Sequence, residues 1–200
     1  MPITFDQEER TFHLQNDKIS YVLQVTKEGY LLHRYWGKAI RRYHESAPLV
    51  FLDRGFSPSP TPDDRTFSLD TLPMEYPAYG NGDFRAPAFE VAFPDGSRVT
   101  NLQYVSHCIT GGKPKLAGLP ATYVENDAEA QTLDITMKDA LSGLEAVLSY
   151  TIFEQTGAIT RSVRFQNKGK EPIRLLRVLS ANVDFRDDRF DLLTLDGAHA

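Results

Sequence analysis

Apolar residues recur at every second position through most of this chain. From Leu144 to Phe153, alternate residues are apolar and would share one face of a strand. Residues 133–138 and 159–166 alternate in the same way, and 19–26 are apolar and β-branched. A period of two is typical of strands with one packed and one wet face. No window of a dozen residues keeps a helical period with caps, so the sequence predicts an all-β fold.

Polar turns between these runs predict antiparallel pairing in a β-sandwich. Residues 94–97 (PDGS) would join 89–93 to 98–101 in a short hairpin. Residues 173–185 are apolar on both faces in their middle, so we expect a central strand buried between layers. A helical turn or two is expected only at residues 38–46.

One stretch, residues 52–88, breaks the strand pattern. It holds six of the chain's 12 prolines, which remove ladder donors and fix φ. Its aromatic residues are too many for a disordered linker, and they are Phe56, Phe67, Tyr76, Tyr79 and Phe84. We therefore expect an ordered irregular segment, and long loops of this kind are usually functional.

Charge and composition exclude several classes of protein. The net charge of −5 argues against a nucleic-acid partner. No apolar run reaches the roughly 20 residues of a membrane helix, and the N-terminal residues lack the layout of a signal peptide. The lone Cys108 excludes a disulfide framework, and we expect it to be a buried small hydrophobe. Cytoplasmic location, with no cofactor and no metal, is the resulting expectation.

Carboxylates and arginines concentrate in residues 52–88. The carboxylates are Asp53, Asp63, Asp64, Asp70, Glu75 and Asp83. Beside aromatic rings they suit sugar binding, although acidic residues also simply solvate loops and cap turns. Arg54, Arg65 and Arg85 each follow an aspartate closely, and such pairs serve as loop staples, sugar contacts or both. The spacing leaves these alternatives open.

Several linked blocks resemble the N-terminal part of bacterial family 36 α-galactosidases, and the likeness covers nearly the whole chain. The blocks are Phe56-Ser57-Pro58, Asp64 to Leu72 (DRTFSLDTL), Glu75-Tyr76-Pro77, Tyr79-Gly80, Asp83 to Ala88 (DFRAPA), Lys113 to Val124 (KPKLAGLPATYV), Ile159-Thr160-Arg161-Ser162 and Leu179 to Phe185 (LSANVDF). Linked blocks of this length are far more specific than one short motif.

The resemblance implies an antiparallel β-supersandwich, similar to galactose mutarotase, that precedes a catalytic (β/α)₈ barrel. Such enzymes hydrolyse terminal α-D-galactosyl residues of melibiose and raffinose with retention, using two aspartates of the barrel. They are often tetramers in which an N-terminal loop of one subunit reaches the active site of another. On this likeness, Asp53 and Arg65 are our candidates for substrate contacts, and this chain itself supplies no catalytic residue.

The chain departs from that pattern in length. A (β/α)₈ barrel alone needs about 250 residues, so we expect residues 1–200 to form only the N-terminal β-sandwich domain, incomplete at its C-terminal end. Bare strand edges would then invite self-association. Two other hypotheses remain: a freestanding carbohydrate-binding module, and a mutarotase-like enzyme. The mutarotase chemistry would need a histidine and a glutamate converging in one cleft, and the five histidines are scattered.

Overall fold

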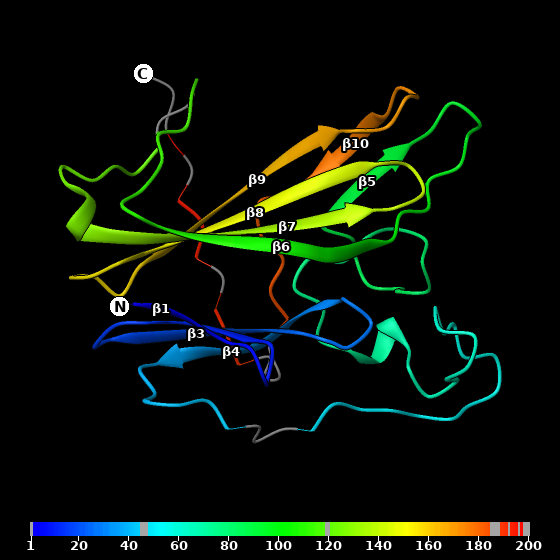
Figure 1. Cartoon of the computed structure of the whole chain (residues 1–200), viewed down its shortest axis with the longest axis horizontal. Coiled ribbons are helices and arrows are strands. Elements are labelled where there is room, and N and C mark those ends of the chain that lie inside the picture. The colour runs from blue at the N-terminus through cyan, green and yellow to red at the C-terminus, as the bar shows by residue number, and fades with distance from the viewer. Residues whose placement is uncertain are drawn as a thin grey trace.

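Two four-stranded antiparallel sheets face each other in the computed structural model (Figure 1). The structure describes residues 2–44, 48–118, 121–184, 189–191, 193–195 and 197. The first sheet has the order β1 (Ile3–Asp6), β2 (Thr11–Gln15), β3 (Ile19–Val25) and β4 (Leu31–Lys38). The second has the order β6 (Leu102–Gly111), β7 (Ala130–Asp139), β8 (Leu144–Phe153) and β9 (Ile159–Asn167).

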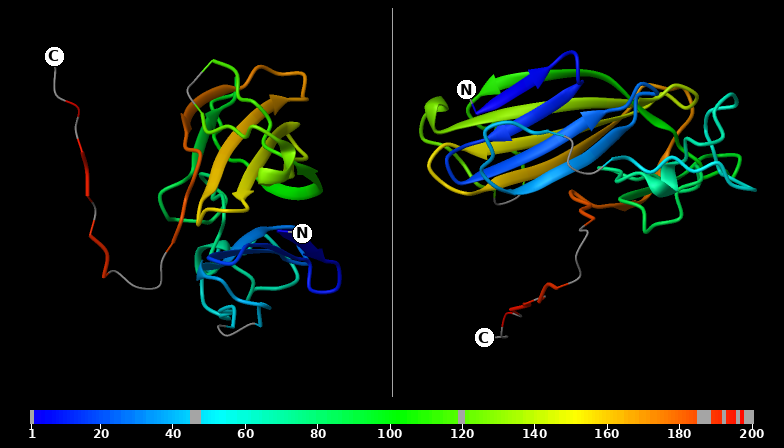
Figure 2. Two further views of the ribbon diagram at one scale, coloured as in Figure 1. Left: turned by 90° about the vertical axis from the view of Figure 1, so that its left-hand side faces the viewer. Right: turned by 90° about the horizontal axis from the view of Figure 1, so that it is seen from below.

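A third, two-stranded sheet lies beside the second, as the views in Figure 2 show. It pairs β5 (Phe89–Ala92) with β10 (Arg174–Val178), antiparallel and with a register shift between Leu175 and Arg177. The two helical segments are short 3₁₀ turns, η1 (Leu69–Thr71) and η2 (Asp127–Glu129). All named strands of the described residues pair antiparallel, which confirms the predicted all-β fold class.

The main core fills the space between the two larger sheets. Alternate residues of β8, from Leu144 to Ile152, are at most 3% exposed, so the predicted packed face is confirmed. Leu133, Ile135 and Met137 of β7 and Phe12, Leu14 and Leu23 of the first sheet belong to the same cluster. Burial of these side chains contributes roughly 1.5–3 kcal/mol each, which is what holds the sheets face to face.

A second, smaller core lies beneath the segment that joins β4 to β5. Its buried members are Tyr30, Leu32, Phe67, Leu69, Leu72 and Met74. An isolated bridge pairs Leu32 with Met74, and the amide of His33 donates to the Pro73 carbonyl at 2.8 Å. The irregular segment is thus packed onto the edge of the first sheet, around η1.

Residues 173–185 do not form the predicted central strand. Only Arg174–Val178 is a strand, and all its residues are exposed; Leu175 and Leu176 are 47% and 43% exposed. The prediction of a buried central strand is wrong because β10 does not enter the core. It pairs with the short β5 beside the second sheet. Phe185 lies outside the described residues.

Three local predictions were also wrong. Residues 98–101 form no strand with β5. The turn closes through hydrogen bonds of the Phe93 amide to the Ser97 carbonyl and of the Gly96 amide to the Phe93 carbonyl, and β5 pairs with β10 instead. Among residues 38–44 there is no helical turn, and 45–47 lie outside the described residues. Cys108 is exposed, because its position in β6 points away from the core.

Candidate functional site

The candidate site is a broad groove beside η1. It lies where the segment that joins β4 to β5, here called the joining segment, meets β4. Its volume is about 1000 Å³. The lining residues are His33, Arg34, Tyr35, Trp36, Pro48, Leu49, Val50, Asp70, Thr71, Leu72, Pro73, Arg85 and Asp184. The β4 side of the groove thus carries aromatic residues and Arg34, and the joining segment adds both aliphatic and charged side chains.

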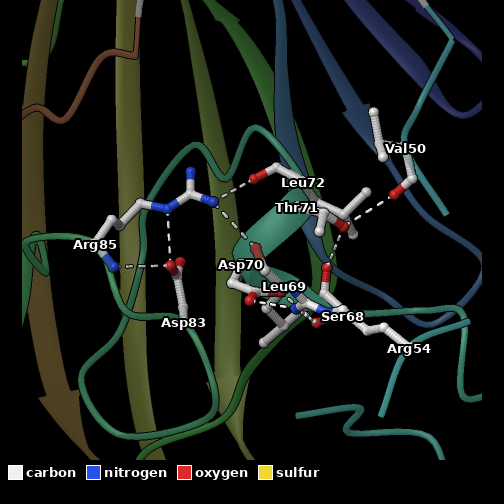
Figure 3. A network of polar contacts seen from close by, with 9 residues as sticks. All are labelled: Val50, Arg54, Ser68, Leu69, Asp70, Thr71, Leu72, Asp83 and Arg85. Carbon is white, nitrogen blue, oxygen red and sulfur yellow. Dashed lines mark hydrogen bonds and ion pairs between the residues drawn. The ribbon is translucent and has the colours of Figure 1, made fainter. Parts of the chain in front are cut away.

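Asp70 organises one side of η1 (Figure 3). Its two carboxylate oxygens accept separately from the Ser68 hydroxyl and the Arg54 guanidinium. Burial opposes ionisation of the Asp70 carboxyl, but these two donors outweigh it and lower its pKa. Asp70 is therefore an ionised, fully engaged carboxylate and not a proton donor for a reaction.

Arg85 organises the other side of η1 (Figure 3). Its Nη2 donates to the Leu69 and Leu72 carbonyls, which also accept from the backbone amides of Leu72 and Met74. Its Nε lies 2.8 Å from Asp83 Oδ1 and its Nη1 2.6 Å from Asp184 Oδ2. Burial raises the pKa of the Asp83 carboxyl, and Arg85 offsets only part of that shift. Both aspartates are thus tied to one guanidinium.

Asp53 and Arg65, the two residues predicted to bind substrate, lie side by side on the surface. Arg65 Nη2 is 3.5 Å from Asp53 Oδ1, and the two side chains are 66% and 67% exposed. Arg65 also donates to the Arg54 carbonyl at 3.3 Å. In the structure Arg65 pairs with Asp53, and Arg54 pairs with Asp70. Of the three arginines, Arg85 alone pairs with the aspartate that closely precedes it in the sequence, Asp83.

Several exposed apolar side chains lie near Asp53 along the chain. Val50, Phe51 and Leu52 are each about half exposed (49%, 50% and 48%), and Phe56 is fully exposed. Phe56 also has a φ of +58°, a conformation that non-glycine residues seldom adopt. Of the loop aromatics, Phe67 and Tyr76 pack into the two cores, whereas Phe56, Tyr79 and Phe84 face solvent. The loop that carries Asp53 therefore exposes several apolar side chains to solvent.

A second cluster of functional groups lies between the two larger sheets, around Glu75. The Glu75 carboxylate is fully buried and accepts from the hydroxyls of Tyr21 and Tyr150 at 2.8–2.9 Å. Arg161 Nη2 lies 2.7 Å from Glu75 Oε1, and His33 Nδ1 lies 3.3 Å from Oε2. Burial, followed by the neighbouring Glu75 charge, raises the pKa of both tyrosine hydroxyls. These groups stay protonated and act as hydrogen-bond donors.

Sequence reasoning named Glu75 among the loop carboxylates but did not find this cluster. Its partners come from β3, β4, β8 and β9, so no local spacing signals it. His33 and Glu75 do converge, as a mutarotase would require. However, the Glu75 side chain is 0% exposed and that of His33 only 10%, so the Glu75 carboxylate is shielded from a sugar in the groove.

The described part of the chain contains no group of three or more His, Cys, Asp or Glu residues that could hold a metal ion. Within the same residues no helix is long and apolar enough to cross a membrane. The charged pairs, hydroxyls and exposed rings described above are groups that bind polar ligands and protein surfaces.

Comparisons with known proteins agree with this architecture. The chain is 54% identical over 198 residues to α-galactosidase AgaA of Geobacillus stearothermophilus and 45% identical over 199 residues to α-galactosidase Mel36A of Lactobacillus acidophilus. The crystal structure of α-galactosidase AgaB from G. stearothermophilus matches with a TM-score of 0.86 and 56% identity over 92% of this chain and 25% of that one.

These relatives are much longer than residues 1–200. The alignments cover 99% of this chain but only 27% of AgaA and of Mel36A, so the chain spans about a quarter of their length. The model of the glycosyl hydrolase family 36 N-terminal domain matches residues 29–200. The chain therefore belongs to the glycosyl hydrolase family 36 N-terminal domain family.

Proposed function

We propose that this domain is the non-catalytic N-terminal part of an α-galactosidase whose catalytic barrel lies outside residues 1–200. The enzyme would hydrolyse terminal α-D-galactosyl residues of oligosaccharides such as raffinose and melibiose, with retention. Similarity to AgaA over 99% of this chain carries this proposal. Variants of AgaA have been crystallised in complex with raffinose and with stachyose, and their N-terminal parts match this chain at 58% identity.

The carboxylates of this domain fit a non-catalytic role. A retaining glycosidase needs two carboxyl groups about 5–5.5 Å apart that face the sugar. Among the described residues, the buried carboxylates are Glu75, Asp83 and Asp139. Glu75 and Asp83 are held by arginines, and Asp139 accepts from the Leu141 amide. The groove aspartates Asp70 and Asp184 are likewise held by arginines.

We further propose that Asp53 and Arg65 bind substrate hydroxyls at the rim of a sugar pocket in a neighbouring subunit of a homo-oligomer. Their exposed ion pair offers an acceptor and a planar donor to the same ligand. The apolar side chains beside them, Phe51, Leu52 and Phe56, suit burial in a subunit interface. We also propose that residues 1–200 form one β-sandwich domain and that the protein is located in the cytoplasm.

The test is the Asp53→Ala variant in the complete α-galactosidase. We expect the KM for raffinose and melibiose to rise about tenfold, the effect of about 1.4 kcal/mol of lost binding. Asp95→Ala, in an exposed turn far from the loop along the chain, is the control. A KM equal to that of the unmodified enzyme would overturn the substrate role of Asp53.

Exposed rings favour a second candidate, a freestanding carbohydrate-binding module. Phe56 is fully exposed and Phe84 is 80% exposed, so both can stack on the apolar face of a sugar. Calorimetry of the 200-residue chain with galactose and raffinose separates the candidates. Millimolar or tighter binding supports the module, whereas absence of heat supports a domain that needs its barrel.

A further inference from the structure

The loop from Val50 to Phe56 exposes most of its apolar side chains, although the Phe51 ring meets Phe67 of the second core with 6.4 Å between centroids. Four of its side chains, Val50, Phe51, Leu52 and Phe56, are about half to fully exposed. Its closest contacts are polar and lead to η1 or to the residues just before it. Thr71 Oγ1 donates to the Val50 carbonyl at 2.9 Å, and the Leu52 amide donates to the Thr66 carbonyl at 3.3 Å. The loop is thus tied to one short 3₁₀ turn.

The third tie is the ion pair between Arg54 and Asp70, which is the strongest of the set because both groups are charged. Arg54 also donates to the Ser68 hydroxyl at 3.3 Å, and Ser68 in turn donates to Asp70. Ser68 is 1% exposed, so the base of this triad is fixed by the second core. The Asp70 side chain is 16% exposed, against 39% for Arg54.

Arg54 touches both residues of the proposed substrate pair. It follows Asp53 directly, so its position fixes the Asp53 Cα to within one peptide unit, about 3.8 Å. Its carbonyl accepts from the Arg65 guanidinium at 3.3 Å. A change at Asp70 can therefore reach Asp53 and Arg65 through Arg54, without altering either side chain.

We propose that Asp70 and Arg54 are positioning residues that hold Asp53 and Arg65 in the geometry in which they meet substrate. This inference rests on the proposed function of the pair. Asp70 is assigned an indirect role, because each of its oxygens already accepts from Ser68 or Arg54 and its side chain is only 16% exposed. Arg85 holds η1 in place from the opposite side, because it donates to the carbonyls of Leu69 and Leu72.

The first experiment measures the loop in the 200-residue chain. Trypsin cleaves after Arg54 only when that side chain leaves Asp70, so we expect Asp70→Asn to accelerate this cleavage at least tenfold. Cleavage after the exposed Lys115 serves as the internal reference, so that a general loss of stability does not imitate the effect. Asp95→Asn is the matched control, because Asp95 also caps a local turn, at Ser97, but is not bonded to the loop. An unchanged ratio of the two cleavages overturns the proposal.

The second experiment measures catalysis in the complete α-galactosidase. We expect Asp70→Asn to raise the KM for raffinose severalfold and to leave kcat within twofold, because the residue acts on binding geometry. A merely structural role would lower the amount of active enzyme and leave KM unchanged. If the loop loosens and Asp53→Ala raises KM but Asp70→Asn does not, the positioning role is wrong. If Asp53→Ala itself has no effect, the failure belongs to the proposed function.

Discussion

Glu75 and Arg161 form a buried ion pair that connects the segment between β4 and β5 to the second sheet. Arg161 Nη2 lies 2.7 Å from Glu75 Oε1, and the two side chains are 11% and 0% exposed. Arg161 also lies over the ring of Tyr150 and donates to the Asn182 carbonyl at 3.3 Å. This one contact thus connects the segment that carries the candidate site, the core between the sheets and the chain beyond β10.

Removing the charge of Glu75 would leave Arg161 buried without its counter-ion. We predict that Glu75→Gln lowers the free energy of unfolding by about 3–5 kcal/mol, the cost of breaking a buried pair. Urea denaturation of the 200-residue chain measures it. Glu145→Gln is the control, since Glu145 meets Lys138 at 3.5 Å with side chains 19% and 40% exposed. It should cost no more than about 1 kcal/mol, and equal costs for the two variants would contradict the structural role of Glu75.

The strands could be predicted because their signal is local. Residues 144–153 alternate in the sequence, and the alternate positions from Leu144 to Ile152 are all buried, as are the apolar positions of β7. The burial of residues 173–185 could not, because an apolar run is equally compatible with a central strand and with an exposed one. Its surroundings depend on β5, some 80 residues earlier in the chain.

We predict that two histidines, the buried His13 and the half-buried His107, make stability depend on pH. Burial lowers the pKa of His13 and of His107 below the ordinary value of 6.5. Between the folded and unfolded pKa values the unfolded chain binds more protons, so the free energy of unfolding falls as the pH drops below about 6.5. Each histidine contributes at most about 1.4 kcal/mol per pH unit.

Chemical denaturation at pH 7.5, 6.5 and 5.5 checks this prediction. The double variant His13→Gln and His107→Gln should show a flatter slope than the parent chain, and each single variant an intermediate one. These substitutions keep a polar partner near the Ser20 and Tyr104 hydroxyls, which lie 3.0 Å and 2.7 Å from the imidazoles. A double variant with the parental slope would show that other groups cause the dependence.

Two turns at one end of the second sheet approach each other too closely for a side chain. A Cβ added at Gly169 would lie 2.0 Å from the Ser142 carbonyl oxygen, so the backbone would have to move. We predict that Gly169→Ala costs about 1–3 kcal/mol, the usual effect of overpacking. At Gly157 the added Cβ would meet only the Lys18 Cβ at 3.7 Å, so Gly157→Ala should stay within about 0.5 kcal/mol. Similar thermal unfolding of both variants would contradict the close approach.

The candidate site could be predicted only in part. The wealth of carboxylates, arginines and aromatics in residues 52–88 marks the segment, and Asp53 and Arg65 do lie together. The pairing of Arg54 with Asp70, across 16 residues and one 3₁₀ turn, has no signature in the sequence. The same holds for Glu75, whose partners come from four strands.

The central claim is that the bond-breaking carboxylates lie outside residues 1–200. The most direct test is the hydrolysis of p-nitrophenyl α-D-galactopyranoside by the purified 200-residue chain, with its β-sheet content verified by circular dichroism. We predict no release of nitrophenol above the uncatalysed rate. Turnover by this chain, abolished by substitution of one of its own aspartates or glutamates, would contradict it.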